Sequence, residues 1–216
     1  MSLRSCLSFV LLLGLFTGCG DDDAPGDSGP GADSGPRSDS GPRMDSGPQM
    51  DAGPGFDAGI EMPAHCADGP LEAPLPPADC QLDALPSTGD VAEDCVQRIN
   101  QFRRECQCLP PLERWREGES CAAMHAEYDA DGRGAHAGFR DRICENGGRG
   151  QNECPGYPSE GSIINGCLQQ MWDEGPGEPF SEHGHYINMS NPAHSRVACG
   201  QFVTAEGRVW AIQNFR

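Results

Sequence analysis

The chain has 216 residues and a formal net charge of −18, with 33 aspartate and glutamate residues against 15 basic ones. All of the basic residues are arginines, so no lysine amine is available for Schiff-base chemistry or for binding phosphate. The acidic residues occur both in the N-terminal third and in the rest of the chain. Because a nucleic-acid-binding protein needs a basic surface, we expect no nucleic-acid partner.

Residues 1–18 have the three parts of a secretory signal peptide. Arg4 is the positive end, an apolar stretch runs from Leu7 to Phe16, and small residues precede Cys19. The apolar stretch is too short for a permanent membrane span. Phe16-Thr17-Gly18-Cys19 resembles a bacterial lipobox, in which the cysteine is acylated and becomes the mature N-terminus. We therefore predict an exported lipoprotein, periplasmic or at the cell surface, whose membrane partner is reached through lipidated Cys19. The alternative is an ordinary cleaved signal peptide.

Residues 19–65 form a low-complexity segment with a period of six residues. Asp-Ser-Gly-Pro recurs from Asp27 to Asp45, and variants begin at Asp51 and Asp57. A collagen triple helix needs glycine at every third residue, so this period does not fit one. Proline and charge extend such a chain, and few apolar residues are present to stabilise a fold. The segment is predicted to be a disordered tether.

Ten of the 12 cysteines lie between Cys66 and Cys199, after the predicted tether. An even number of cysteines in an exported chain indicates up to five disulfide bonds, and the sequence leaves their pairing open. No CxxC pair is present, which makes a zinc knuckle the less favoured interpretation. Residues 66–89 are rich in proline and contain two of these cysteines. They are predicted to be an irregular lead-in that disulfides hold against a domain formed by residues 90–216.

Three helices are predicted in this domain. The first starts at the N-cap Asp90 and has an apolar stripe with an exposed arginine face; the stripe is Val91, Cys95, Ile99, Phe102 and Cys106. The second runs from about Glu117 to Tyr128, with His125 at its surface or partly buried; its predicted buried residues are Cys121, Met124 and Tyr128. The third ends at Gly175-Pro176-Gly177, and its apolar side is Ile164, Cys167, Leu168 and Met171.

The end of the chain has the pattern of a β-hairpin. Residues 197–203 and 208–215 read as strands, and Ala205-Glu206-Gly207 between them is a turn whose glycine supplies a positive φ. Trp172, Trp210 and Tyr186 are expected in the core, because such side chains are usually buried. Helices followed by strands, without βαβ alternation, predict an α+β domain with an antiparallel sheet.

Several segments of the domain resemble motifs of one known family. Gly184-His185-Tyr186-Ile187-Asn188 is similar to a GHYTQ signature, and Val197-Ala198-Cys199-Gly200 is similar to the strand that follows it. Residues 169–174 resemble a helix that ends in Trp-Tyr-Asp-Glu, with the tryptophan moved by one place. Ala135-His136-Ala137 and Gly150-Gln151-Asn152 resemble a His-Ser and a Gly-Glu-Asn segment. These are motifs of the CAP or SCP-like superfamily of cysteine-rich secretory, antigen and pathogenesis-related proteins. The resemblance covers residues 90–216 and implies a disulfide-rich α-β-α sandwich with a central antiparallel sheet.

The resemblance also implies a central cleft with four polar side chains: His136, Gln151, Glu174 and His185. Gln151 stands where many members have a second glutamate, and Glu145 or Glu153 would take its place if the alignment shifts. His136, His185 and Glu174 are implied as ligands of Zn²⁺ or another divalent cation. A neutral amide is a weaker ligand than a carboxylate, so Gln151 departs from the family's ligand set.

Two classes of function follow from this interpretation. The first is an extracytoplasmic binding module whose ligand is unknown: a divalent metal ion, a lipid, a glycan or a peptide. The second is a hydrolase, with or without a metal, in which the catalytic candidates are His185 as base, Glu174 as the residue that orients it, and His136. The sequence contains no GxSxG, HExxH or phosphate-loop motif, which favours the binding module.

Overall fold

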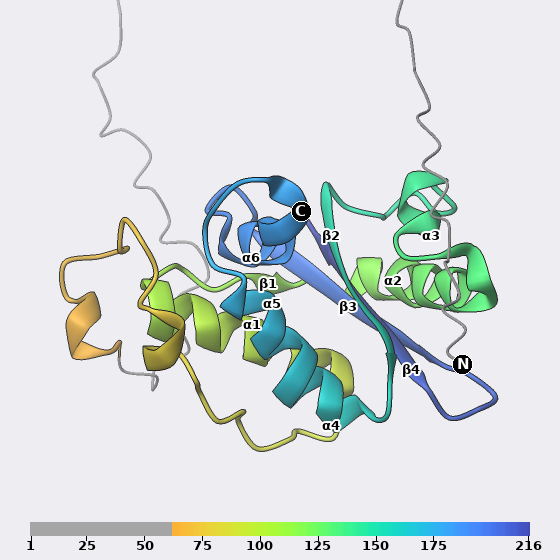
Figure 1. Cartoon of the computed structure of the whole chain (residues 1–216), viewed down its shortest axis with the longest axis horizontal. Coiled ribbons are helices and arrows are strands. Elements are labelled where there is room, and N and C mark those ends of the chain that lie inside the picture. Colours follow the sequence, from red (N-terminus) through yellow and green to blue (C-terminus); the bar gives the residue numbers. More distant parts are fainter. Residues whose placement is uncertain (1–61) are drawn as a thin grey trace, which may run out of the picture. The chain divides into compact units, whose positions relative to one another are not determined.

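The computed structural model describes residues 62–216, so the predicted signal peptide, Cys19 and nearly all of the tether lie outside the described residues. In this part of the chain, no helix has both the length and the apolar character of a membrane span. The helices and strands are shown in Figure 1. Their bounds are α1 Val91–Gln107, β1 Glu113–Arg114, α2 Arg116–Tyr128, α3 Ala137–Arg140, β2 Gly150–Tyr157, α4 Glu160–Ser162, α5 Leu168–Asp173, α6 Phe180–Ser190, β3 Arg196–Val203 and β4 Val209–Phe215.

The sheet has four strands in the order β1-β3-β4-β2. β3 and β4 form the predicted antiparallel hairpin, and β2 pairs antiparallel with the other edge of β4. Only the two-residue strand β1 is parallel to its neighbour β3. β2 is therefore an edge strand of the described sheet, and the registration of Gln151 opposite Asn214 fixes which of its side chains face which side.

Helices cover both faces of the sheet. On one face, the apolar sides of α1, α5 and α6 pack on the strands in the main core, where Ile99, Trp172 and Met189 are fully or almost fully buried. On the other face, Ala122 and Ala126 of α2 pack on Ile212 of β4. Gly200 lets α2 approach β3 closely, because a Cβ there would lie 2.3 Å from the backbone nitrogen of Ala123. The predicted α+β sandwich is confirmed, with helices, a central sheet and helices as its layers.

All ten described cysteines are paired, which confirms the predicted number of five disulfides. The pairs are Cys66–Cys108, Cys80–Cys106, Cys95–Cys199, Cys121–Cys144 and Cys154–Cys167. The first two attach the irregular lead-in to the C-terminal end of α1. The third joins α1 to β3, the fourth attaches the loop before β2 to α2, and the fifth attaches β2 to the turn that precedes α5. Such cross-links stabilise mainly by restricting the unfolded chain.

The three predicted helices and the hairpin are confirmed, and so is the N-cap of α1. The Asp90 side chain accepts hydrogen bonds from the backbone N–H groups of Ala92 and Glu93. The third helix is divided into α4, a wide turn over Ile163–Cys167, and α5. Trp172 and Tyr186 are buried in the core as predicted, whereas Trp210 is half-buried.

Two predictions about α1 and α2 were wrong. The arginine face of α1 is not exposed, because Arg98 and Arg103 are buried with 2% and 0% of their surface accessible. Arg103 donates to the carbonyl groups of Met189 and Asn191, which gives the buried charge its partners. On α2, Met124 is 44% exposed and His125 is buried, contrary to the prediction, whereas Cys121 is buried as predicted and Tyr128 is partly buried.

Two of the elements that were not predicted from the sequence matter for the site. The first is α6, which carries the Gly-His-Tyr segment and buries Tyr186, Met189 and Ser190. The second is β2, whose strand pattern is hidden by Gly150, Pro155 and Gly156. Both of these elements supply residues to the candidate site.

Candidate functional site

Side chains from both faces of the sheet meet at the edge strand β2. Gln151 and Glu153 point to the face that α2 covers, where Gln151 contacts His125. Asn152 points to the opposite face and donates a hydrogen bond of 3.0 Å to the backbone carbonyl of His185 in α6. β2 thereby holds the segment of His136 on one side and α6 on the other.

His136 is fixed by its backbone as well as by its ring. It has a left-handed backbone conformation, with φ of 61°, at the residue before α3. Its backbone N–H donates to Oε2 of Glu153 at 2.6 Å, and its ring atom Nδ1 lies 2.8 Å from Oε1 of Gln151. The His136 side chain is 35% exposed, so one side of the ring reaches solvent.

His185 is oriented by Glu174, the residue that follows α5. Nδ1 of His185 lies 2.5 Å from Oε1 of Glu174. The other carboxylate oxygen of Glu174 accepts from the backbone N–H of His185 at 3.0 Å. Glu174 therefore contacts the ring nitrogen nearer to the backbone and restricts how the ring can turn.

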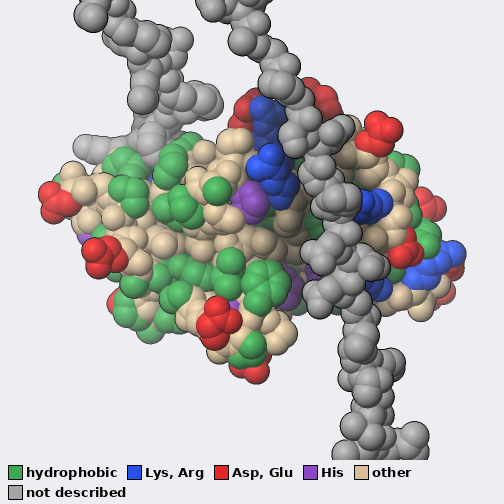
Figure 2. All heavy atoms as spheres, turned by 90° about the horizontal axis from the view of Figure 1, so that it is seen from above, with side chains coloured by type: hydrophobic (Ala, Val, Ile, Leu, Met, Phe, Trp, Pro, Cys, Tyr) green, Lys and Arg blue, Asp and Glu red, His purple; other side chains and the backbone are tan. Residues whose placement is uncertain are grey.

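The two histidine rings lie near each other, with centroids 6.4 Å apart and planes tilted by 32°. The structure thus brings together His136, Gln151, Glu174 and His185, which we call the His–Glu cluster. Both Nδ1 atoms are occupied, and no residue of 62–216 is hydrogen-bonded to either Nε2. Histidine side chains do reach the surface on the face shown in Figure 2. Of the alternatives to Gln151, Glu153 lies below His136, whereas Glu145 is exposed and lines a separate hollow.

The cluster fits a divalent cation in part. Two imidazoles that share a tetrahedral Zn²⁺ have centroids about 5 Å apart. The centroids of His136 and His185 are 6.4 Å apart, so the two rings must approach each other to bind one ion. His136, His185 and Glu174 do not form a compact three-ligand group in the described residues. Glu174 contacts Nδ1 of His185, which places it to orient that ligand instead of binding the same ion.

Two other groups hold three potential ligand atoms within 4.8 Å of one another in residues 62–216. They are His65 with Cys66 and Cys108, and His125 with Cys121 and Cys144. In each group, the two cysteine sulfur atoms are bonded to each other in a disulfide. A disulfide sulfur is not a thiolate, so these groups are not metal sites in the oxidised protein.

A pair of buried carboxyl groups, Asp129 and Glu153, lies next to His136, and their burial could not be predicted from the sequence. Asp129 and Glu153 are 0% and 4% exposed, and each has one side-chain oxygen without a hydrogen-bond partner. Burial, together with the nearby Asp129, raises the pKa of Glu153 to about 7, although the N–H of His136 acts in the opposite direction. Ionising Glu153 next to another buried carboxyl group is costly, so Glu153 keeps its proton at mildly acidic pH.

We expect Glu153→Gln to remove a pH dependence of stability. The pKa of Glu153 is higher in the folded protein than the ordinary 4.5, so its contribution to stability is lost as the pH rises from about 4.5 to about 7. The glutamine amide can still accept from His136 and can donate to Asp129. As the pH rises from 5 to 8, the wild type loses this contribution and the variant does not. The unfolding free energy of the variant minus that of wild type should therefore increase by about 2–3 kcal/mol over this interval.

Urea unfolding at several pH values measures this difference. The comparison with wild type is needed because burial lowers the pKa of His125, which acts with the opposite sign. Exposed Glu145→Gln is the matched control and should leave the pH profile unchanged. Parallel profiles for wild type and Glu153→Gln would contradict the raised pKa of Glu153.

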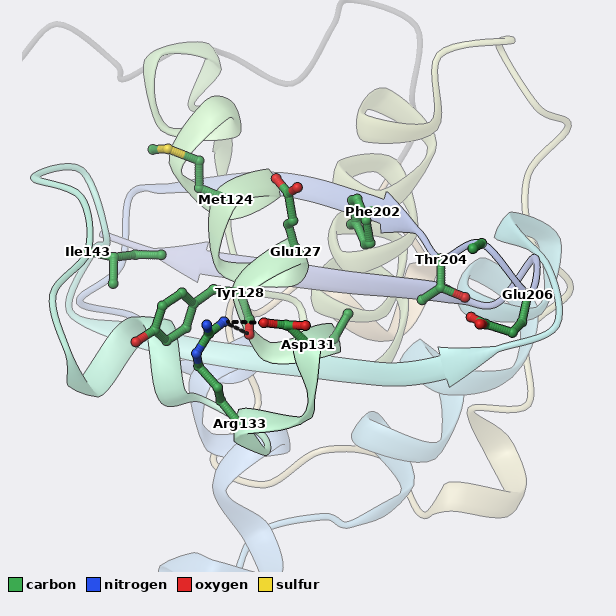
Figure 3. Close-up of a pocket in the computed structure, with 11 residues that line it drawn as sticks. Met124, Glu127, Tyr128, Asp131, Arg133, Ile143, Phe202, Thr204 and Glu206 are labelled. Carbon is green, nitrogen blue, oxygen red and sulfur yellow. Dashed lines mark hydrogen bonds and ion pairs between the residues drawn. The ribbon is translucent and has the colours of Figure 1, made fainter.

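Two further hollows lie away from the cluster. One, of about 740 Å³, is shown in Figure 3; Arg133 stacks on Tyr128 and pairs with Asp131 at its margin. The other, of about 310 Å³, lies between α1, α2, the turn at Ile163–Cys167 and the sheet. Most of its lining is apolar, but it includes Gln213, whose fully buried amide has no hydrogen-bond partner.

Comparison with known proteins finds no matching family model and no significantly matching curated sequence. Among solved structures, BmVAL-1 is similar with a TM-score of 0.43 and 17% identity, over 60% of this chain and 77% of its own. Na-ASP-1 is similar with a TM-score of 0.42 and 17% identity, over 68% of this chain and 43% of its own. This chain therefore matches less than half of Na-ASP-1. Both are CAP superfamily proteins of the venom allergen-like type. Similarity at this level does not assign a family, so the proposal below is based on the residues of the cluster.

Proposed function

We propose that the chain is an exported, lipid-anchored binding module of CAP type that binds a divalent metal ion, with Zn²⁺ as the first candidate. The observation that carries this proposal is the pair of neighbouring imidazoles, His136 and His185, each with a hydrogen-bonding contact at Nδ1 and none at Nε2. Five disulfides support export, because disulfides persist in oxidising compartments. The sequence motifs described above support the CAP assignment.

The surroundings of the two rings match the outer shell of a metal site. A histidine that binds a metal usually donates its other N–H to a carboxylate or carbonyl oxygen, which fixes the ring and makes it more basic. Glu174 supplies a carboxylate for His185, and Gln151 supplies an amide carbonyl for His136. With two protein ligands, the remaining coordination positions would be filled by water or by a group from a partner molecule.

Calorimetric titration of residues 62–216 in the oxidised form with Zn²⁺ should show one site. We expect His136→Ala or His185→Ala to weaken binding at least tenfold and the double variant to abolish it, because each removes a ligand nitrogen. Co²⁺ can replace Zn²⁺ as a spectroscopic probe of the same site.

His65→Ala is the matched control, since His65 is exposed and bonds only to the carbonyl of Glu105. Absence of binding at micromolar Zn²⁺ would reject the metal-binding proposal. Binding that persists in the double variant would place the ion elsewhere.

The 310 Å³ hollow supports a second ligand class, an apolar chain with a polar head. Ala123 and Ile164 contribute apolar surface, and the unpartnered carboxamide of Gln213 could pair with a carboxylic acid or amide.

We expect palmitate to displace a fluorescent fatty acid from the protein. Ala123→Phe should weaken this binding at least tenfold by filling the hollow, whereas Ala130→Phe, which faces the other hollow, should not. Equal affinities in the two variants would exclude this location.

The hydrolase alternative has one specific observation in its favour, the contact between Glu174 and Nδ1 of His185, which is how a general base is oriented. No serine, threonine or cysteine side chain of residues 62–216 is hydrogen-bonded to either ring of the cluster. Such an enzyme would therefore use water as the nucleophile.

If the protein is a hydrolase, we expect it to turn over esters, peptides or cell-wall fragments, and we expect Glu174→Gln to lower this turnover at least 100-fold. Turnover that this variant leaves unchanged would exclude the mechanism.

A further inference from the structure

A chain of hydrogen bonds connects a disulfide to the His–Glu cluster through two buried side chains. It starts at Cys121–Cys144, passes through His125 and Gln151, and ends at His136. His125 and Gln151 are 1% and 7% exposed, so water does not compete for these contacts. The direction of each hydrogen bond can be assigned from the chemistry of the partners.

The disulfide end fixes the tautomer of His125. Nε2 of His125 lies 3.3 Å from Sγ of Cys144 and 3.8 Å from Sγ of Cys121. Disulfide sulfur carries no hydrogen, so Nε2 can only be the donor in these contacts. Burial lowers the pKa of His125, which favours the neutral ring with a single N–H. That proton therefore sits on Nε2, and Nδ1 is a hydrogen-bond acceptor.

The lone pair on Nδ1 of His125 then fixes the orientation of the Gln151 amide. Nε2 of Gln151 lies 2.8 Å from this Nδ1 and 3.0 Å from Oδ1 of Asn214, so its two hydrogens have two acceptors. The opposite orientation would place the Gln151 oxygen against both acceptors. It would also require the proton of His125 to move to Nδ1. Nε2 would then have no hydrogen to donate to the sulfur atoms, which is costly in a buried site.

With its amide nitrogen facing His125, Gln151 presents its oxygen to His136. Oε1 lies 2.8 Å from Nδ1 of His136 and can only accept, so the proton of neutral His136 is on Nδ1. Nε2 of His136 is then the nitrogen with the lone pair. This is the atom that the proposed metal ion would need.

We propose that Gln151 is a positioning residue that transmits the tautomer of His125 to His136, and thereby keeps Nε2 of His136 available to a cation. The relevance of that nitrogen rests on the proposed metal-binding function, but the tautomers themselves do not. A glutamate at position 151 could still accept from Nδ1 of His136, but it could not connect the two histidines, because a carboxylate has no hydrogen to donate to His125. The glutamine is therefore the residue that makes the tautomer of His136 depend on that of His125.

Long-range ¹H–¹⁵N NMR spectra of the metal-free protein test the proposal, because they identify the protonated nitrogen of each histidine. In wild type we expect the proton of His125 on Nε2 and that of His136 on Nδ1. In Gln151→Met, His136 should lose its preference for Nδ1–H, and Zn²⁺ affinity should fall about 10- to 100-fold, as it does when an outer-shell partner is removed. Gln97→Met is the control, since Gln97 bonds Glu93 on α1 and should leave both histidine spectra unchanged.

Gln151→Glu provides a sharper comparison. Its carboxylate can still accept from Nδ1 of His136, so the tautomer of His136 should persist, whereas His125 should gain a proton on Nδ1. A wild-type His136 with its proton on Nε2 would overturn the proposal, and this measurement needs no variant to fold. An unchanged His136 spectrum in folded Gln151→Met would also overturn it. If the tautomers are as expected but Zn²⁺ does not bind, the proposed function fails and the positioning role of Gln151 stands.

Discussion

The pairing of β2 with β4 determines which polar side chains meet in this domain. Because side chains alternate across a strand, the registration that places Gln151 opposite Asn214 also sends Glu153 toward Asp129 and Asn152 toward α6. A shift of one residue would exchange these sets between the two faces. The disulfide from Cys154 to Cys167 attaches the same strand to the turn before α5. The cluster therefore depends on a strand register that both hydrogen bonds and a covalent bond hold.

The site has an unusual division between charged and neutral groups. Glu174 brings a carboxylate to one histidine, whereas the other histidine receives an amide, and its backbone N–H donates to Glu153, whose pKa is raised by burial. Neutral partners reduce the cost of burying the groups around His136. The two imidazoles consequently have different environments, although their ring centroids are only 6.4 Å apart. Such asymmetry suits a site in which one ring is held mainly by charge and the other mainly by the geometry of its hydrogen bonds.

The sequence was informative where local patterns decide the structure. The stripe of α1, its cap at Asp90 and the hairpin around Gly207 follow from spacing and turn chemistry, and the even number of cysteines gave the number of disulfides. The histidines and Glu174 could be named only from their resemblance to family motifs. β2 escaped prediction because glycine and proline interrupt its pattern, and its pairing depends on a strand more than fifty residues away. His125, Asp129 and Glu153 gave no local signal, since burial of a polar residue depends on partners that only the fold brings together.

The burial of Arg98 and Arg103 has a consequence for the field around the domain. Their guanidinium groups are used inside the protein, where they bond to carbonyl and amide oxygens. Fewer positive charges are then left at the surface to pair with the many aspartates and glutamates, so the potential close to the surface carboxylates is more negative than it would be with these two arginines exposed. Small cations in the surrounding solution accumulate in such a potential, which raises their local concentration near any site that can hold one.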